Sequence, residues 1–395
     1  MATSQGDVSG QRLQALSASA ETMLRLCRDA GASQAEVSLS EDVGLSVNVR
    51  MGEVETVEHT RDRSIGVTVY FGKRKGSAST ADLQPDSLRA TVEQACAFAR
   101  YTEEDPAAGL ADPDRLALPG PEGFPEYDQW HPWGIDAEAA IALGIECESA
   151  GRDADRRIGN SEGAAVSSSE SLSVYANSHG FIGAERATSH ALSVSLIAGH
   201  GDGMQRDYWY TSGLAPEDLD SPQSVGRRAA ERAVARLDPR SAPTGEFPVL
   251  FVPEMARSLI GHLLGAVSGG ALYRRASFLL DSLGQPVLPD WLDLVEHPHR
   301  RHGLRSAAFD NEGVATRESA LVEGGVLQRY LLGSYSARKL GLQSTGNAGG
   351  VFNLDVGANA LDFTELLSGM KRGLVVTELM GQGANTVTGD YSRGA

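Results

Sequence analysis

The feature that most constrains the fold is a change of hydrophobic period near Gly31. Residues 10–30 place apolar side chains at helical spacings, and a glycine often follows the end of a helix. The following segments instead alternate apolar and polar residues, as half-buried strands do; they are residues 35–40, 43–50, 53–60 and 64–72. Such short connections favour antiparallel pairing. Residues 87–102 return to helical spacing, so residues 1–102 predict helix, four or five strands and helix.

The same order of elements recurs in residues 136–240. A helix is predicted first, then three strands, then a second helix; the ranges are 136–151, then 163–178, 188–198 and 204–211, then 218–237. The last helix starts near Ser221, with Pro222 in its first turn. The order of elements, without detectable residue identity, suggests a weak internal repeat.

Residues 103–135 connect the two regions and are rich in proline, glycine and acidic residues, which is typical of a surface connection. Four aromatic residues in this segment predict that it is pinned to the protein rather than loose; they are Phe124, Tyr127, Trp130 and Trp133.

Residues 241–395 predict a strand-rich C-terminal domain. We expect a short buried strand at residues 247–253, a glycine-broken helix at residues 254–270 and a hairpin turning at Glu-Gly-Gly in residues 320–332. Residues 374–381 form another buried strand, and the chain stops at Ala395 without a terminating feature, so we expect a domain truncated at its C-terminus. The predicted fold class is α+β.

Charge and cysteine content limit the class of function. The net charge of −17 disfavours nucleic acid and anionic membrane surfaces as partners. The three cysteines are too widely spaced for a CxxC motif, and neither a signal peptide nor an apolar run of about 20 residues is present. We therefore expect a reduced, cytoplasmic protein.

One histidine cluster offers possible metal ligands. His297, His299 and His302 lie within six positions, but no carboxylate or cysteine stands at a conventional ligand spacing and two arginines interrupt the cluster. A polar loop is the simpler interpretation, and a metal site is the weaker alternative. His262 lies at the edge of an apolar helical arc, where a lone histidine is more often a hydrogen-bonded core group than a ligand.

Three glycine clusters match no phosphate-binding motif. Residues 199–203, 346–350 and 381–383 lack both the Walker spacing and the strand–helix context of a dinucleotide site, so tight turns are predicted. Neither HExxH nor GxSxG occurs, and the residues alone indicate no catalytic constellation.

Long strings in the last 150 residues resemble the TldD/PmbA family of peptidase subunits, in particular its PmbA (TldE) branch. These strings are residues 268–292, 296–299, 309–317, 334–350 and 373–395. The resemblance implies a heterodimer with a TldD-type zinc metallopeptidase and a closed chamber that cleaves unfolded or extended peptides. Precursors of peptide antibiotics and antitoxin proteins are among the implied substrates.

The resemblance also implies that this chain lacks the zinc motif. The TldD-type partner carries His-Glu-x-x-x-His on a helix; here Gly261 and Ala266 stand at the two histidines and His262 at the glutamate. Glycine and alanine offer no ligand, and histidine does not replace the carboxylate that takes a proton from zinc-bound water. We therefore expect no cofactor in this chain and zinc in the partner.

Three hypotheses follow from the sequence. The first is a non-catalytic subunit that completes the chamber and captures peptides by adding them to a strand edge. The second is a self-sufficient metallopeptidase with an unconventional histidine site, and the third is a peptide-binding regulatory homodimer.

Overall fold

The computed structural model describes residues 5–121, 123–357, 361–381 and 383–395, and these form two compact units. The first unit comprises Met1–Val69, Gly76–Tyr101 and Asp128–Ala242; the second comprises Tyr70–Lys75, Thr102–Tyr127 and Pro243–Ala395. Residues 1–102 and 136–240, predicted as separate regions, thus lie mostly in one unit. No described helix combines the length and apolar character that a membrane span requires.

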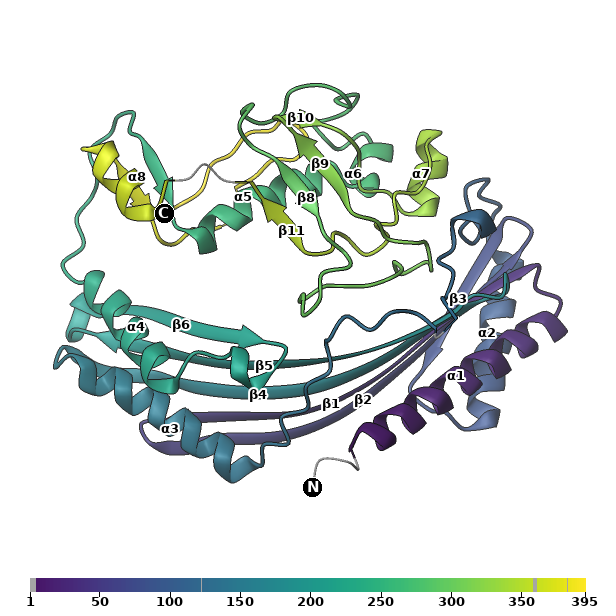
Figure 1. Ribbon diagram of the computed structural model, residues 1–395, viewed down its shortest axis with the longest axis horizontal. Helices are drawn as coiled ribbons and strands as arrows, with labels where there is room; N and C mark the ends of the chain where they lie inside the picture. The colour runs from purple at the N-terminus through teal and green to yellow at the C-terminus, as the bar shows by residue number, and fades with distance from the viewer. Residues whose placement is uncertain (1–4, 122, 358–360, 382) are drawn as a thin grey trace. The chain divides into compact units, whose positions relative to one another are not determined.

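The first unit is built on one six-stranded sheet with strand order β3-β2-β1-β4-β5-β6 (Figure 1). Its strands are β1 (Gln34–Arg50), β2 (Glu53–Phe71), β3 (Arg74–Thr80), β4 (Ile158–Asn177), β5 (Ile182–Ala198) and β6 (Gln205–Gly213). The antiparallel pairing of β1 with β4 joins the two halves of the predicted repeat into a single sheet.

Two helix pairs cover one face of this sheet, toward opposite ends of its long strands (Figure 1). The pairs are α1 (Gln5–Asp29) with α2 (Pro85–Tyr101), and α3 (Ala137–Ala154) with α4 (Pro222–Ala235). Nearly all the odd-numbered residues of β1 are buried, so its whole length turns the same face toward helices. Val37 and Leu39 lie in its first half, and Val47 and Val49 share a core with α3 and α4.

The predicted number of strands in residues 35–72 was wrong. Residues 35–40 and 43–50 belong to the single strand β1, and residues 53–60 and 64–72 belong to β2. Gly44 is not a turn residue: a Cβ added there would lie 2.9 Å from Thr60 Oγ1, so glycine permits a close approach between strands.

The second unit has short strands and long loops. A four-stranded sheet has the order β10-β9-β8-β11, and β12 pairs with β7 in parallel. The strands are β7 (Val249–Phe251), β8 (Leu294–Glu296), β9 (Ser319–Glu323), β10 (Val326–Leu327), β11 (Leu354–Val356) and β12 (Leu374–Val376). The helices are α5 (Pro253–Ala266), α6 (Gly269–Tyr273), α7 (Ser334–Leu340) and α8 (Phe363–Met370).

Several local predictions are confirmed here. The hairpin of β9 and β10 turns at Gly324 and Gly325, which both have positive φ as a tight two-residue turn requires. The connection after residue 102 is pinned, because Leu116 bridges to Val314 and the Phe124 ring packs 5.0 Å from Phe309. The α+β class is confirmed, although the C-terminal strands are only two to five residues long.

Candidate functional site

Helix α5 carries the three residues that the sequence aligns with a zinc motif. Leu263 and Ala266 are buried in the core of the second unit, with Ala266 fully inaccessible. Gly261 and Gly265, four residues apart, are exposed, and a Cβ built on either meets no atom within 4 Å. The solvent side of α5 therefore has free space where side chains would project.

The donor set on α5 does not fit zinc. Gly261 and Ala266 have no ligand atom, which leaves His262 as the one possible donor of the three. The His262 ring is half-buried and lies 5.6 Å from the ring of Tyr391, tilted by 57°. Its Nδ1 is buried, and no residue in the described part of the chain accepts or donates a hydrogen bond there.

The other histidine cluster is divided among separate partners. His297 Nδ1 lies 3.0 Å from a carboxylate oxygen of Glu318. His299 Nε2 lies 3.1 Å from Thr316 Oγ1. The backbone N–H of His302 donates to the carbonyl of Tyr127 at 2.7 Å.

The rings of Tyr127 and His299 are stacked, with centroids 5.6 Å apart. Across the described ranges, the three histidines of the 297–302 segment do not group as ligands around one point. These contacts favour a structural role for the loop after β8.

A pocket of about 610 Å³ opens beside the C-terminal end of α5. Its volume is within the range of about 300–1,000 Å³ that is common for ligand sites. Leu264, Leu331 and Val351 supply aliphatic walls, and Tyr273 and Tyr335 supply aromatic ones. Six glycines also line it: Gly265, Gly269, Gly270, Gly333, Gly349 and Gly350.

The aromatic wall is held in position from α7. Tyr335 donates its hydroxyl to Asp105 Oδ2 at 2.7 Å, and Lys339 donates to Oδ1 of the same carboxylate at 2.9 Å. These two hydrogen bonds lower the pKa of Asp105 to about 2, and the bond to Asp105 raises the pKa of Tyr335. Tyr273 packs edge-on against Tyr335, with centroids 5.6 Å apart.

The loop of residues 346–350 forms a second wall. Gly346, Gly349 and Gly350 have φ values of 74°, 102° and 113°, in the region that favours glycine. A Cβ on Gly346 would also lie 2.6 Å from the carbonyl oxygen of Ala315. The predicted turn is therefore confirmed, and it brings backbone atoms to the pocket surface.

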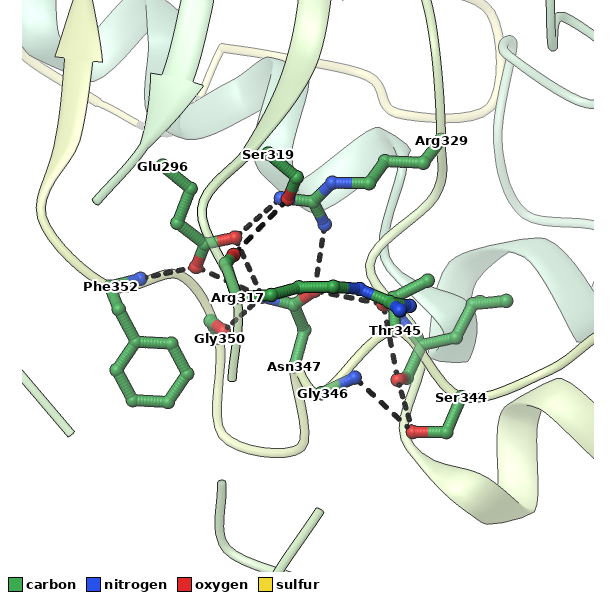
Figure 2. Close-up of polar contacts among 11 residues, drawn as sticks. Glu296, Arg317, Ser319, Arg329, Ser344, Thr345, Gly346, Asn347, Gly350 and Phe352 are labelled. Atoms are coloured by element: carbon green, nitrogen blue, oxygen red, sulfur yellow. Dashed lines mark hydrogen bonds and ion pairs between the residues drawn. The ribbon is translucent and has the colours of Figure 1, made fainter. Parts of the chain in front are cut away.

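A buried ion pair holds this loop through hydrogen bonds to Asn347 (Figure 2). Glu296, at the end of β8, pairs with Arg329 and accepts hydrogen bonds from Asn347 Nδ2 at 3.0 and 3.1 Å. Asn347 in turn accepts from Arg329 at 2.7 Å and from Thr345 at 2.8 Å. Burial lowers the pKa of Arg329, and the neighbouring Glu296 opposes that shift.

Two acidic residues connect the same loop to α7. Asp310 is buried and accepts backbone N–H bonds from Glu312, Val314 and Ala348 at 2.9, 3.0 and 2.9 Å. Burial raises the pKa of Asp310 to about 7, although these three donors lower it. Glu312 lines the pocket and accepts from the backbone N–H of Ser334, the first residue of α7, at 2.7 Å.

Sequence reasoning did not identify this pocket. The strings 309–317 and 334–350 resemble the family, but the contact of Asn347 with Glu296 joins residues 51 positions apart and has no local pattern. Asp310 and Glu312, beside the turn at Gly313, could have been a signal, because acidic residues beside a turn often accept backbone N–H bonds. Of the other two glycine clusters, residues 199–203 form a turn between β5 and β6, while 381–383 include Gln382, outside the described residues.

Comparison with known proteins places the chain in a family of metallopeptidases with a mixed α/β fold. Three family models match: PmbA/TldA metallopeptidase domain 1 at residues 35–99, the central domain at 130–237 and the C-terminal domain at 244–395. The chain is 48% identical over 361 residues to metalloprotease PmbA of Escherichia coli O157:H7, covering 91% of this chain and 79% of that protein. The chain belongs to the PmbA/TldD metallopeptidase family.

Other relatives agree with this assignment. A metalloprotease PmbA homolog of Haemophilus influenzae is 45% identical to this chain, over 94% of this chain and 82% of its own length. A metalloprotease TldD homolog of the same species is 21% identical, over 84% of this chain and 71% of its own length. A crystal structure from Bacteroides thetaiotaomicron has a TM-score of 0.89 at 26% identity, covering 95% of this chain and 84% of that one. TldE from Thermococcus kodakarensis shares the fold, with a TM-score of 0.76 at 19% identity over 92% of this chain and 83% of its own.

Proposed function

We propose that this chain is the PmbA/TldE-type, non-catalytic subunit of a cytoplasmic TldD–TldE metallopeptidase complex. In this proposal the TldD-type partner holds zinc and cleaves unfolded or extended peptides, including precursors of peptide antibiotics and antitoxin proteins. This chain completes the chamber and guides the peptide. Family membership supports the peptidase class, and the occurrence of PmbA and TldD homologs in one species supports a pair of chains.

The observation that carries the non-catalytic role is the donor set on α5. Zinc peptidases need several nitrogen, oxygen or sulfur ligands and a carboxylate that accepts a proton from the bound water. The turn of α5 at these positions offers glycine, histidine and alanine. Ala266 is also packed into the core, so no solvent-facing ligand replaces it.

The test is reconstitution with a TldD-type partner, for example the Haemophilus influenzae homolog. We expect a stable complex on size-exclusion chromatography and cleavage of an unfolded peptide that EDTA abolishes and zinc restores. Separate elution, together with equal cleavage by the partner alone, would contradict the proposal.

Metal analysis separates the alternatives. We expect no stoichiometric zinc in the isolated chain. Stoichiometric metal that is lost in both His297→Ala and His299→Ala would instead favour a self-sufficient peptidase. A metal-free chain that copurifies from its host with a second copy of itself and with no TldD-type chain would favour a regulatory homodimer.

A further inference from the structure

The pocket beside α5 has the composition of a side-chain binding site. We propose that it binds an aromatic side chain of an extended peptide, which deepens the proposed function by giving this subunit a part in peptide selection. The inference therefore rests on the proposed function for its biological meaning, but the binding itself is a property of this chain alone.

The walls favour an aromatic group. Tyr273 and Tyr335 already form an edge-to-face pair at an interplanar angle of 80°, and a third ring beside them would extend the favourable edge-to-face or offset geometry. Leu264, Leu331 and Val351 provide apolar contact on the remaining sides. Because the Tyr335 hydroxyl is bound to Asp105, this ring needs little further ordering when a ligand arrives.

The charges at the pocket favour a neutral ligand group. Arg305 and Glu312 both line it, so one cation and one anion are present. Arg305 Nη2 lies 3.4 Å from the carbonyl of Gly349, and its guanidinium is 6.0 Å from the Phe352 ring. Glu312 is already engaged by the N–H of Ser334. Among the described residues that line the pocket, a phosphate or carboxylate would meet one cation and one opposing carboxylate. The nearby Arg274 and Lys339 already lie over the rings of Tyr273 and Tyr335.

The glycine-rich walls favour a peptide rather than a free aromatic molecule. Gly349 and Gly350 on one side and Gly270 on the other carry no side chain, so a bound peptide backbone can approach closely. Gly269 has no room for a larger residue, since its Cβ would lie 2.2 Å from Ser336 Oγ. The shape of this wall thus depends on glycine.

The loop that forms the wall is preorganised. Asn347 lines the pocket while its amide group is held by Glu296 and Arg329, so the loop is held in place before a ligand binds. A preformed wall lowers the entropy cost of binding a flexible peptide.

Helix α5 offers a matched pair of variants for the test. Gly265 lines the pocket, and Gly261 lies one helical turn earlier outside it; both are exposed, and a Cβ on either meets nothing within 4 Å. Gly265→Trp therefore adds an indole at the pocket wall, and Gly261→Trp adds the same bulk on the same helix outside the pocket. Circular dichroism and thermal melting establish that both variants are folded.

The probes are two capped heptapeptides, Gly-Ser-Gly-Phe-Gly-Ser-Gly and its counterpart with alanine at the centre, titrated calorimetrically into the isolated full chain. We expect the phenylalanine peptide to bind about tenfold more tightly, as burial of an aromatic side chain predicts. Gly265→Trp should abolish this preference and Gly261→Trp should retain it. N-acetylphenylalanine amide should bind more weakly than the peptide.

Equal binding of both peptides, or an undiminished preference in Gly265→Trp, would overturn the inference, as would equally tight binding of N-acetylphenylalanine amide. If Gly265→Trp does not fold, Tyr273→Leu replaces it and should reduce the preference severalfold. Because no partner and no zinc are present, failure here leaves reconstitution with a TldD-type chain untouched, and failure of reconstitution leaves this binding result standing.

Discussion

The two units hold their backbones in different ways. In the first unit the ladder between β1 and β4 runs without interruption from Glu36 opposite Asn177 to Val49 opposite Ala164. In the second unit the strands are short, and single side chains such as Glu296 and Asp310 hold the loops by accepting backbone N–H bonds.

This difference explains where recognisable strings occur along the chain. A strand ladder is made by the backbone, so many side chains with the right alternation satisfy it. A loop that depends on Glu296, Asn347 and Asp310 needs those residue types at those positions, because a substitute leaves buried donors unsatisfied. The long strings that resemble the family accordingly lie after residue 245.

The largest expected effect tests this difference directly. Glu296→Gln leaves the buried Arg329 without its counter-charge, and we expect the free energy of unfolding of the second unit to fall by about 3–5 kcal/mol. Hydrogen exchange of peptides covering residues 344–352 measures the effect locally.

Glu41→Gln is the control in the first unit. Glu41 is also buried and is bound by Arg12, Arg61 and Arg63, which lower its pKa despite burial. These arginines remain 22–61% exposed, so water can solvate them after the substitution, and we expect a loss of about 1 kcal/mol. Equal losses in the two variants would refute the contrast between the units.

The same contrast shows how far the sequence predicts the fold. Helical spacing and alternation located α2, α3, α4 and the β4–β6 strands because these elements are held by periodic burial. The sequence predicts strand breaks near Asp42 and Asp62, but both residues lie inside continuous strands, β1 and β2. Arg61 and Arg63, which flank the second of these sites, bind Glu41 across the sheet, so charges that look like a turn are cross-strand ion pairs.

The candidate site was predictable only in part. The sequence located α5 and the turn at residues 346–350, which are local features. The pocket depends on Glu296 meeting Asn347 and on Asp105 meeting Tyr335, contacts between residues far apart in the chain. No spacing rule encodes such pairs, and only the folded chain shows them.

Helix packing gives the next prediction. Gly226 on α4 lies against α3, and a Cβ there would be 2.2 Å from the carbonyl oxygen of Cys147. Gly226→Ala should therefore destabilise the first unit by about 1–3 kcal/mol through overpacking. Gly261→Ala on the exposed side of α5 should instead stabilise by about 0.5–1 kcal/mol, since alanine favours a helix.

Urea unfolding separates these two effects. Trp130, Trp133 and Trp209 lie in the first unit, so tryptophan fluorescence reports mainly on its unfolding. A stabilising effect of Gly226→Ala would contradict the close helix contact. Hydrogen exchange in α5 provides the corresponding measurement for Gly261→Ala.

The turn between β1 and β2 is an exception within the first unit, because a side chain holds it. Glu148 of α3 is fully buried and accepts the backbone N–H groups of Met51 and Gly52, both at 2.8 Å. Gln has one acceptor oxygen, so Glu148→Gln should cost about 1–2 kcal/mol. Hydrogen exchange at residues 50–53 should rise while exchange in β4 changes little; an equal rise in β4 would mean that the effect is not local.

The smallest expected effect compares a half-buried and a buried carboxyl whose pKa values are raised to about the same value. Burial raises the pKa of Glu185 on β5 to about 7, and it raises that of Asp310 to about 7 against three backbone donors. Between about pH 4.5 and 7 the folded state keeps a proton on Glu185 that the unfolded state has lost, so stability falls as the pH rises. Glu185→Gln removes this loss and should stabilise the protein by about 1 kcal/mol at pH 8.

Asp310→Asn should have the opposite sign at pH 8. This substitution also removes a titrating group, but it replaces one of the two oxygens that accept backbone N–H bonds with an N–H₂ group. That N–H₂ then faces a backbone N–H, and both donors are left without an acceptor. Melting temperatures of both variants at pH 5 and pH 8 test the pair. If both substitutions stabilise at pH 8, the acceptor role of Asp310 is unimportant, and the view that single side chains hold the loops of the second unit is wrong at that position.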